Sequence, residues 1–492
     1  MDGRPLSSWL EAAHADLPLS VADTAARVGR VHAVVLGAGI AGLLAARVLA
    51  DHFDAVTIVE RDRLPEAEPS PRAGAPQAGH VHGLLARGHA ILERLFPDLD
   101  AELGAAGAPL VDWTQDCWWY TFGGWKPRFP SGILTRSASR DRLEWTIRRR
   151  VRGLRRVRFL EQHEAVALLP TSGGARIGGV LVRDRGQADG AATELGADLV
   201  VDASGRGSRA PDWLAALGFP RPRETTVNAF LGYASRWYAP PAGWSAWQVL
   251  AMVATPPAGK RGGIIQTIEA NQWVVTLAGA ARDYPPTDEE GFLAFARSLP
   301  SPELYQAIAQ AEPISPIRGY RRTENRLRHY EQLGRWPAGF LALGDAVCSL
   351  NPVYAQGMTV AALGAFALDR SLRRRGVRGA RLPRRFQRDL ARAQATPWLL
   401  ATAEDFRHPT TEGPRPGPTS HLMHRYIDRL QLVATHSPAA HGALIEVLNL
   451  LRPPVGLLTP WLALQALLVY RRARGSIRCT SRSGPGSGPM VP

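Results

Sequence analysis

Lysine is almost absent from this chain of 492 residues, which makes its charge balance unusual. Lys126 and Lys260 are the only lysines, so nearly all of the formal net charge of +15 comes from arginine. The arginines are spread along a chain rich in Ala, Gly and Pro, and no zinc-finger or RNA-binding signature accompanies them. A solvated basic surface therefore explains the charge better than nucleic-acid binding, whereas anionic lipid stays open as a partner.

Cysteine and metal-binding clusters are also scarce. Three cysteines lie far apart, at Cys117, Cys348 and Cys479. Without a CxxC pair they exclude a disulfide framework and a thiolate zinc site, and they favour a reducing compartment. His80, His82 and His89 have no acidic or Cys residue nearby in the sequence, so we predict no metal site. The N-terminus lacks the basic and apolar regions of a signal peptide, and the expected location is cytoplasmic.

The chain has no uninterrupted apolar run of about 20 residues at its C-terminal end, where a membrane-spanning helix would be sought. Residues 455–470 (VGLLTPWLALQALLVY) are nearly all apolar, but Pro460 interrupts them and an arginine-rich stretch follows. We expect a helix docked on the protein. The alternative is a peripheral membrane contact through residues 455–474, which would make the protein membrane-associated.

The length and an apolar content of 45% indicate a globular protein of two or more domains. Residues 31–36 (VHAVVL) predict a buried strand. It is followed by a Gly-rich turn, a helix to about Asp51 and a strand over 55–60, which together make a β-α-β unit. Residues 223–281 alternate like antiparallel strands, and 339–343 (GFLAL) predict a strand that returns to the first domain.

The predicted fold is therefore α/β with an α+β second domain. It combines a Rossmann-like dinucleotide-binding domain, an antiparallel-sheet substrate domain and a helical C-terminal region. The predicted boundaries are 1–28 for an N-terminal extension, 29–222 and 321–375 for the two parts of the first domain, 223–320 for the substrate domain, 376–480 for the helical region and 481–492 for a disordered tail.

The Gly-rich turn, Gly37 to Gly42 (GAGIAG), predicts a dinucleotide site. Gly37 permits the tight turn, Gly39 lets the backbone approach a pyrophosphate, and Gly42 allows the helix to pack closely on the sheet. The helix N-terminus, which begins with Ile40 and Ala41, favours the phosphates. Glu60 at the end of the next strand is placed to bind a ribose hydroxyl. These features alone do not distinguish NAD from FAD.

A second motif favours FAD. Gly344-Asp345-Ala346 follows the returning strand, where Asp345 could bind a ribityl hydroxyl. The loop 351–358 (NPVYAQGM) then leads into a helix. Gly357 would let backbone N–H groups face the pyrimidine end of a flavin, and the helix N-terminus would favour the negative charge of a reduced flavin.

Six motifs occur in the order in which one family has them: VVLGAGIAG, VERD, PRAGAPQAGHVH, SRDRLE, DASGRGSR and LALGDAVCSLNPVYAQGMTVAAL. Over about residues 30–370 the chain resembles the FAD-dependent monooxygenases of the aromatic-hydroxylase and squalene-epoxidase type. Within them it is most similar to bacterial epoxidases of polyether antibiotic biosynthesis, which places the expected role in secondary metabolism. The stretch 357–361 (GMTVA) is notably like these epoxidases.

The resemblance implies roles for individual residues. Glu60 would hold the adenosine ribose with Arg61 beside it, and Val166 would meet the adenine through its backbone. Arg72 and Arg140 would face the phosphates or ribityl chain. The complete predicted FAD site is Gly37, Gly39, Ile40, Ala41, Gly42, Glu60, Arg61, Arg72, Arg140, Val166, Gly344, Asp345, Pro352, Gly357 and Met358.

The resemblance also implies the chemistry. Reduced FAD would react with O₂, and a flavin C4a-hydroperoxide would transfer one oxygen atom to an alkene or an electron-rich ring of an apolar secondary metabolite. We predict no catalytic side chain. Trp119, Tyr233 and Trp237 are the expected substrate contacts, from two aromatic clusters at 118–125 and 233–238. An interdomain core explains these aromatics equally well.

Several alternatives stay open. The family often has Asp-Gly where this chain has Ser204-Gly205, with Asp202 two residues earlier. Because that motif helps bind FAD and NAD(P)H, the electrons could come from NAD(P)H or from a flavin reductase. A hydroxylase and a prenyl-chain reductase share the architecture. A halogenase is disfavoured because residues 118–125 lack the Trp-x-Trp-x-Ile-Pro pattern. A hypothesis from another class of protein is a flavin-binding partner that is membrane-associated and has no catalytic activity.

Overall fold

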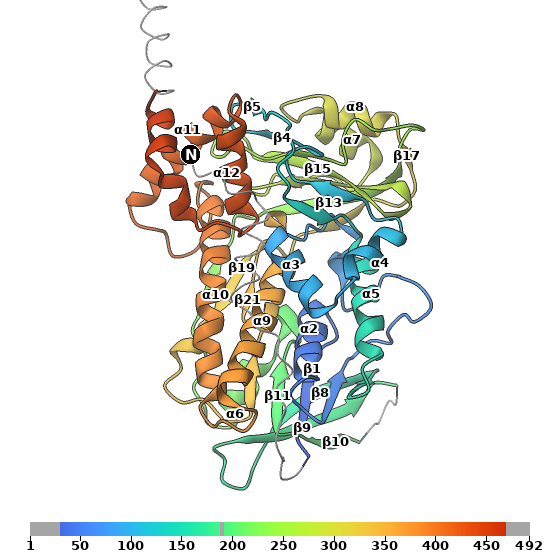
Figure 1. Ribbon diagram of the computed structural model, residues 1–492, viewed down its shortest axis with the longest axis vertical. Helices are drawn as coiled ribbons and strands as arrows, with labels where there is room; N and C mark the ends of the chain where they lie inside the picture. Colours follow the sequence, from blue (N-terminus) through green and yellow to red (C-terminus); the bar gives the residue numbers. More distant parts are fainter. Residues whose placement is uncertain (1–29, 187–190, 469–492) are drawn as a thin grey trace, which may run out of the picture.

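The protein is described from a computed structural model of residues 30–186 and 191–468. The molecule is elongated, with a parallel sheet and its helices at one end and a large, mainly antiparallel sheet at the other (Figure 1). Helices α9 (Gly357–Arg375) and α10 (Leu382–Asp405) run along one side, and the last helices lie beside the large sheet (Figure 1).

The parallel sheet has the strand order β20-β11-β1-β2-β7. Its strands are β1 (His32–Leu36), β2 (Ala55–Val59), β7 (Val157–Leu160), β11 (Leu199–Asp202) and β20 (Phe340–Ala342). These positions confirm the predicted β-α-β opening and the return of the chain to the first domain. The central strands are almost continuously apolar because both faces of this sheet are covered: α2 packs on one face, and the strands β8 (His163–Pro170) and β9 (Ile177–Asp184) pack on the other.

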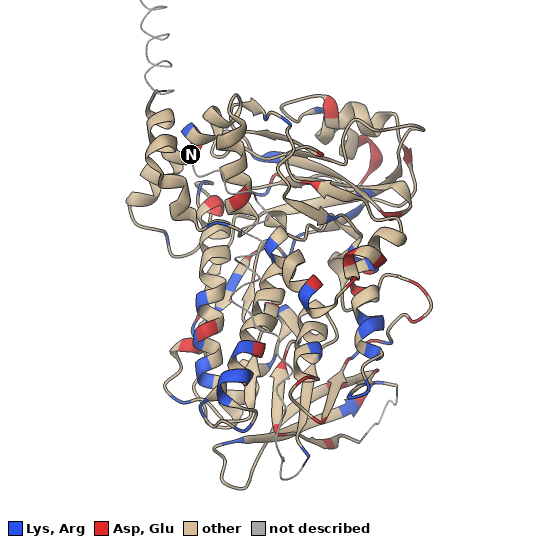
Figure 2. Ribbon diagram, in the orientation of Figure 1, with Lys and Arg blue, Asp and Glu red and all other residues tan. Residues whose placement is uncertain are grey.

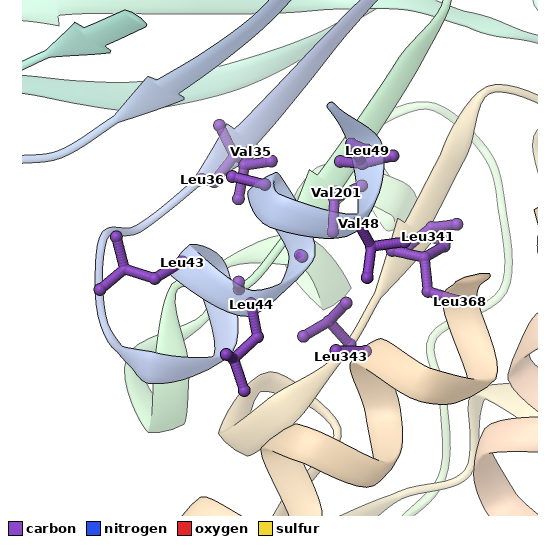
Figure 3. Packing of buried hydrophobic residues seen from close by; sticks show 14 of the residues in the cluster. Val35, Leu36, Leu43, Leu44, Val48, Leu49, Val201, Leu341, Leu343 and Leu368 are labelled. Carbon is purple, nitrogen blue, oxygen red and sulfur yellow. The ribbon is translucent and has the colours of Figure 1, made fainter. Parts of the chain in front are cut away.

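Helix α2 (Ile40–Leu49) packs its buried face between this sheet and α9. Figure 3 shows side chains from β1, α2, β11, β20 and α9 that converge in one core, among them Val48, Leu341 and Leu368. The remaining helices of this half are α3 (Ala86–Leu95), α4 (Leu99–Ala105), α5 (Arg140–Arg152) and α6 (Ala210–Ala216). The predicted helix over 139–152 is confirmed, with Ser139 as its N-cap.

The large sheet has the order β17-β13-β16-β15-β14-β4-β5, and β18 also pairs with β13. Its strands are β4 (Cys117–Thr121), β5 (Gly124–Trp125), β13 (Gly232–Ala239), β14 (Val249–Met252), β15 (Arg261–Ile268), β16 (Gln272–Gly279), β17 (Glu312–Pro313) and β18 (Arg318–Tyr320). The predicted antiparallel sheet is confirmed. It also contains β4 and β5, which lie within residues 29–222, the predicted first part of the dinucleotide-binding domain. Strand β4 pairs with β14 in parallel.

Helices α7 (Glu289–Arg297) and α8 (Glu303–Ala309) cover one face of the large sheet, and the other face is turned toward the first domain (Figure 1). Three smaller sheets are also present in the described residues, and the first of them lies at the end of the molecule away from the large sheet (Figure 1). Their strands are β8 (His163–Pro170), β9 (Ile177–Asp184) and β10 (Thr193–Gly196) in one sheet, β12 (Glu224–Val227), β19 (Asn325–Arg328) and β21 (Cys348–Ser349) in a second, and β3 (Leu110–Asp112) and β6 (Leu134–Arg136) in a third.

The C-terminal region is helical, as predicted. It contains α11 (Thr419–Ala434), α12 (Pro438–Leu448), the short 3-10 turn η7 (Pro454–Leu458) and a helix that begins at residue 460. None of the helices within residues 30–468 is long and apolar enough to cross a bilayer. The predicted N-terminal extension, the predicted tail and Cys479 lie outside the described residues.

Candidate functional site

The Gly-rich turn connects β1 to α2, and its three glycines are required for different reasons. Gly37 has a φ of +98°, and a Cβ at this position would lie 2.7 Å from the Ala203 carbonyl oxygen. A Cβ on Gly42 would lie 1.9 Å from the oxygen of Gly37. A Cβ on Gly39 would meet only the Arg72 guanidinium, at 3.7 Å. The fold itself therefore needs Gly37 and Gly42, whereas space remains in front of Gly39.

Glu60 lies at the mouth of this turn with its carboxylate buried. Its Oε2 accepts a 2.7 Å hydrogen bond from the Ala38 N–H, and its Oε1 accepts a 3.0 Å bond from the Asp62 N–H. The carboxylate thus ties the end of β2 to the turn, where the ribose contact was predicted. That contact stays a prediction.

A buried cluster of arginines and carboxylates adjoins the turn. Arg72 Nε donates to Glu144 Oε1 at 2.7 Å, and Arg140 Nη2 donates to Glu144 Oε2 at 2.6 Å. Burial alone would lower the pKa of the Arg72 guanidinium, but the surrounding carboxylates, Glu144 first, raise it above its ordinary value. Arg140 Nε is buried and has no hydrogen-bond partner among the described groups, so it is a donor left unused.

Two further predicted residues differ in their placement. Val166 lies at a register shift of β8, between Ala165 and Ala167, which both pair with β9. A bulge of this kind frees the backbone groups of the extra residue, which suits the predicted contact with adenine. The Arg61 side chain is 58% exposed, and its Nε lies 3.9 Å from Asp62 Oδ1. Arg61 therefore does not belong to the buried cluster of arginines and carboxylates.

The second predicted motif meets the first at the carboxyl ends of the parallel strands. Gly344 follows β20 with a φ of +64°, and a Cβ there would lie 2.6 Å from the Cβ of Ala41 in α2. The neighbouring Asp345 carboxylate forms no hydrogen bond with any described group. Burial raises its pKa, although Arg206 and Arg140 act in the opposite direction. Asp345 is thus a second polar group without a protein partner, and it senses the charge of Arg140.

The loop 351–358 is held by a buried polar network. Tyr354 OH donates to Asp405 Oδ1 at 2.6 Å, and Asn351 Nδ2 lies 3.3 Å from the same oxygen. Asn325 Nδ2 donates to Asp405 Oδ2 at 2.5 Å, and Tyr233 OH donates to Asn351 Oδ1 at 2.9 Å. Burial raises the pKa of Asp405 to about 7. Sequence reasoning missed Asp405 because it lies on α10, about 50 residues beyond the loop, and belongs to no motif.

The other end of the loop is open. Pro352 begins a short 3-10 turn, and Gly357 begins α9. A Cβ on Gly357 would meet no atom within 4 Å, whereas the neighbouring Met358 is buried. The start of this 19-residue helix therefore faces free space, as a site for the isoalloxazine would require.

The segment 80–83 (HVHG) bridges the loop and the large sheet. His80 Nδ1 is hydrogen-bonded to Ser235 Oγ at 2.7 Å, which in turn bonds to Thr276 Oγ1 at 2.6 Å. A Cβ on Gly83 would lie 2.8 Å from the Cβ of Ala355. Burial lowers the pKa of both His80 and His82 to about 4, so both imidazoles are neutral near pH 7. Within the described residues, no three His, Cys, Asp or Glu side chains form a group that could hold a metal ion.

The period-two alternation of the large sheet divides the aromatic clusters between its faces. Trp118, Tyr120, Trp125 and Tyr238 pack into the core beneath α7 and α8. Trp119, Tyr233 and Trp237 occupy the other face: Trp119 packs in the same cluster as Ala355, and Trp237 Nε1 donates to the Gly79 carbonyl at 3.1 Å. The three predicted substrate contacts therefore all face the loop side, and their contact with substrate stays a prediction.

Asp202 closes its own turn after β11. One of its oxygens accepts hydrogen bonds from the N–H and Oγ of Ser204, at 3.0 and 2.5 Å, and the other accepts from Ser208 Oγ at 2.5 Å. The side chain is fully buried, so its acceptors are used within the protein. The local structure thus explains Asp202 without a ligand.

The chain is similar to a family of flavin-dependent proteins and to several solved flavoprotein structures. A model of the family described as FAD dependent oxidoreductase matches residues 32–206. Protein Rv3254 of Mycobacterium tuberculosis is 37% identical over 399 residues, which cover 78% of this chain and 83% of that protein. Among solved structures, the flavin-dependent brominase Bmp2 covers 91% of this chain and all of its own, with a TM-score of 0.61 and 15% identity. PqsL, a probable FAD-dependent monooxygenase from Pseudomonas aeruginosa, covers 85% of this chain and 99% of its own, with a TM-score of 0.54 and 18% identity.

Proposed function

This chain belongs to the FAD-dependent oxidoreductase family, and from that premise we propose that it is a monooxygenase acting on an apolar secondary metabolite. The proposed reaction transfers one oxygen atom from O₂ to an alkene, giving an epoxide. Hydroxylation of an electron-rich ring is the nearest alternative. The observation that carries the proposal is the sheet face of Tyr233, Ser235 and Trp237, a mainly aromatic wall with Arg318 opposite Ser235. Hydrogen bonds hold this wall against the loop 351–358 through Asn351 and against the segment 79–80.

The residues present fit FAD. Gly39, Glu60 and Arg72 would hold its adenosine diphosphate half, with Val166 beside the adenine. Asp345 would accept from a ribityl hydroxyl, and Arg140 Nε offers a donor that the protein does not use. Gly357 and Met358 at the start of α9 would lie against the isoalloxazine, where the helix N-terminus favours negative charge.

The chemistry that FAD supplies when bound is the activation of O₂ and the oxygen atom to be transferred. The protein contributes position and the exclusion of water. Asp405 holds Tyr354 and Asn351, which keeps the loop closed over the core. Because burial keeps His80 neutral, the His80–Ser235–Thr276 chain can orient a polar group of the substrate without adding a charge.

The electron source is part of the proposal. Since Asp202 is fully used within its turn, we expect no stable nicotinamide site there and propose transient reduction by NAD(P)H or by a flavin reductase. Anaerobic mixing of the FAD-loaded protein with NADPH, with and without substrate, tests this point. Bleaching of the flavin absorbance would favour NADPH. An unchanged spectrum that bleaches when a flavin reductase is added would favour the reductase.

Oxygen transfer is tested with ¹⁸O₂. We would reduce the holoprotein, add a panel of terpenoid and polyketide polyenes, and follow the products by mass spectrometry. Incorporation of one ¹⁸O atom per product molecule is expected. A saturated product without ¹⁸O would favour a prenyl-chain reductase, a halogenated product in the presence of bromide would favour a halogenase, and no product would favour a flavin-binding partner without turnover.

Variants of the two sheet faces show whether the wall selects the substrate. Trp237→Ala should lower kcat/KM for the accepted polyene at least about tenfold, because an apolar contact of that size is lost. Trp118→Phe is the matched control, since Trp118 lies on the face that packs under α7 and α8. Equal activity of both variants would contradict the assignment of the wall.

A further inference from the structure

Exposed apolar side chains gather on the C-terminal helices. Of the fourteen large hydrophobic residues that are exposed within the described residues, eight lie between positions 422 and 468. They are Leu422, Met423, Val455, Leu458, Trp461, Leu464, Leu467 and Leu468. Single exposed hydrophobic residues are ordinary on a protein surface. A concentration of this kind, however, marks a surface that a membrane or a protein partner covers.

The helix over 460–468 (PWLALQALL) is apolar on both sides. Its inner side packs against α11 and α12 through Leu462 and Ala466, which are 3% and 1% exposed. Its outer side carries Trp461, Leu464 and Leu467, which are 47%, 53% and 54% exposed. Gln465 is the only polar side chain apart from the backbone. A helix that is apolar all round is normally enclosed on all sides, so the outer side requires an apolar environment.

Charge identifies the partner. After Glu446 the chain has no acidic residue, whereas it has six arginines, at positions 452, 471, 472, 474, 478 and 482. On α11, Arg425 is exposed close in sequence to Leu422 and Met423. The C-terminal helices at the upper left of Figure 2 are mostly uncharged. An apolar surface in a segment whose sequence has many arginines and no acidic residue after Glu446 matches a bilayer with anionic headgroups, whereas a second copy would bring like charges together.

We propose that η7, the helix over 460–468 and the start of α11 form a surface that binds the interface of anionic membranes. The outer residues Trp461, Leu464 and Leu467 enter the boundary between headgroups and acyl chains, and the exposed Arg425 contacts the lipid phosphates. No described helix is both long and apolar enough to span a bilayer, and the proposed contact is confined to the membrane interface.

Sedimentation with lipid vesicles tests the proposal on the full-length, FAD-loaded protein. We expect binding to phosphatidylcholine vesicles that contain phosphatidylglycerol, little binding to phosphatidylcholine alone, and weaker binding at high salt. Leu464→Glu combined with Leu467→Glu should lower the partition coefficient at least about a hundredfold, because two exposed apolar groups become charged. The matched control is Ile314→Glu, an exposed residue of the large-sheet domain, which should bind like the original protein.

Three results would overturn the proposal. These are equal vesicle binding by the double variant and the original protein, equal binding to neutral and anionic vesicles, and a dimer in light scattering that the double variant abolishes while vesicle binding is absent. The last result would assign the surface to a second copy. FAD content and thermal unfolding of each variant show that the fold is intact, since all three substituted side chains are exposed.

Discussion

Alanine at Gly39 and at Gly42 should act in opposite ways, although both residues belong to one turn. At Gly42 the added Cβ would lie 1.9 Å from a backbone oxygen, against an ordinary contact of about 3.4 Å or more, so the helix must shift. At Gly39 the added Cβ meets only the Arg72 guanidinium at 3.7 Å, an ordinary van der Waals distance, and the φ of −72° suits any residue. We therefore expect Gly42→Ala to damage the apoprotein and Gly39→Ala to damage FAD binding alone.

The magnitudes follow from these contacts. Overpacking against backbone at Gly42 should lower the free energy of unfolding by about 3 kcal/mol or more, with or without FAD. Gly39→Ala should change apoprotein stability by about 1 kcal/mol or less, which is the scale of an N-cap change. A methyl group placed where the pyrophosphate approaches should weaken FAD binding by about 1–3 kcal/mol, or roughly 5- to 150-fold in Kd.

Both effects can be measured on the same preparations. Thermal unfolding of the apoproteins gives the stability, and titration with FAD followed by quenching of flavin fluorescence gives the Kd. The original protein is the reference for each. If Gly39→Ala bound FAD with unchanged Kd, the pyrophosphate would not approach this residue and the predicted site would be misplaced. If Gly42→Ala left apoprotein stability unchanged, the reasoning from backbone contact would be wrong.

Three further predictions concern buried carboxylates. Asp345→Asn should weaken FAD binding about 5- to 30-fold while leaving apoprotein stability equal or higher, since this partly buried carboxylate has no hydrogen-bond partner among the described groups; calorimetric titration and apoprotein melting check both. Asp202→Ala should lower apoprotein stability by about 1–3 kcal/mol without a selective loss of FAD, because the buried Ser208 hydroxyl and the two donors of Ser204 lose their acceptor, and equal melting of variant and original would contradict this. Burial raises the Asp405 pKa from 3.8 to about 7, so its stabilising contribution is complete below pH 4 and is lost as the pH rises through 7. The stability difference between the original protein and Asp405→Asn should shift by about 2–3 kcal/mol between pH 5 and 8 in denaturant titrations, and a constant difference would refute the titration of Asp405 in this range.

The features that are local in sequence were predictable. A strand, a Gly-rich turn and a helix are encoded by contiguous residues, so the β1-α2-β2 unit and the position of Glu60 could be deduced. The strand-like pattern of residues 223–281 likewise predicted β13, β15 and β16. The register shift at Val166 was not predicted, but the residue itself was, through the resemblance to known monooxygenases.

The features that depend on which segments meet could not be deduced in this way. Alternation shows that Trp118 and Trp119 point to opposite faces, but not which face lies under α7 and which faces the loop. The pairing of β4 with β14 joins segments about 130 residues apart, and no local pattern encodes it. Asp405 and the His80–Ser235–Thr276 chain are likewise products of long-range packing.

The Gly37–Gly42 turn illustrates both levels. Its sequence is sufficient to predict a dinucleotide site, because a tight turn and a close helix place steric demands on neighbouring residues. The arrangement around it separates the three glycines: the backbone oxygens of Ala203 and Gly37 exclude a side chain at Gly37 and Gly42, while the space before Gly39 stays free. Those oxygens come into place only when β11 lies beside β1 and α2 folds back over its own turn. Steric demands within a short segment can be deduced from its residues, whereas the free space for a ligand depends on the whole packed structure.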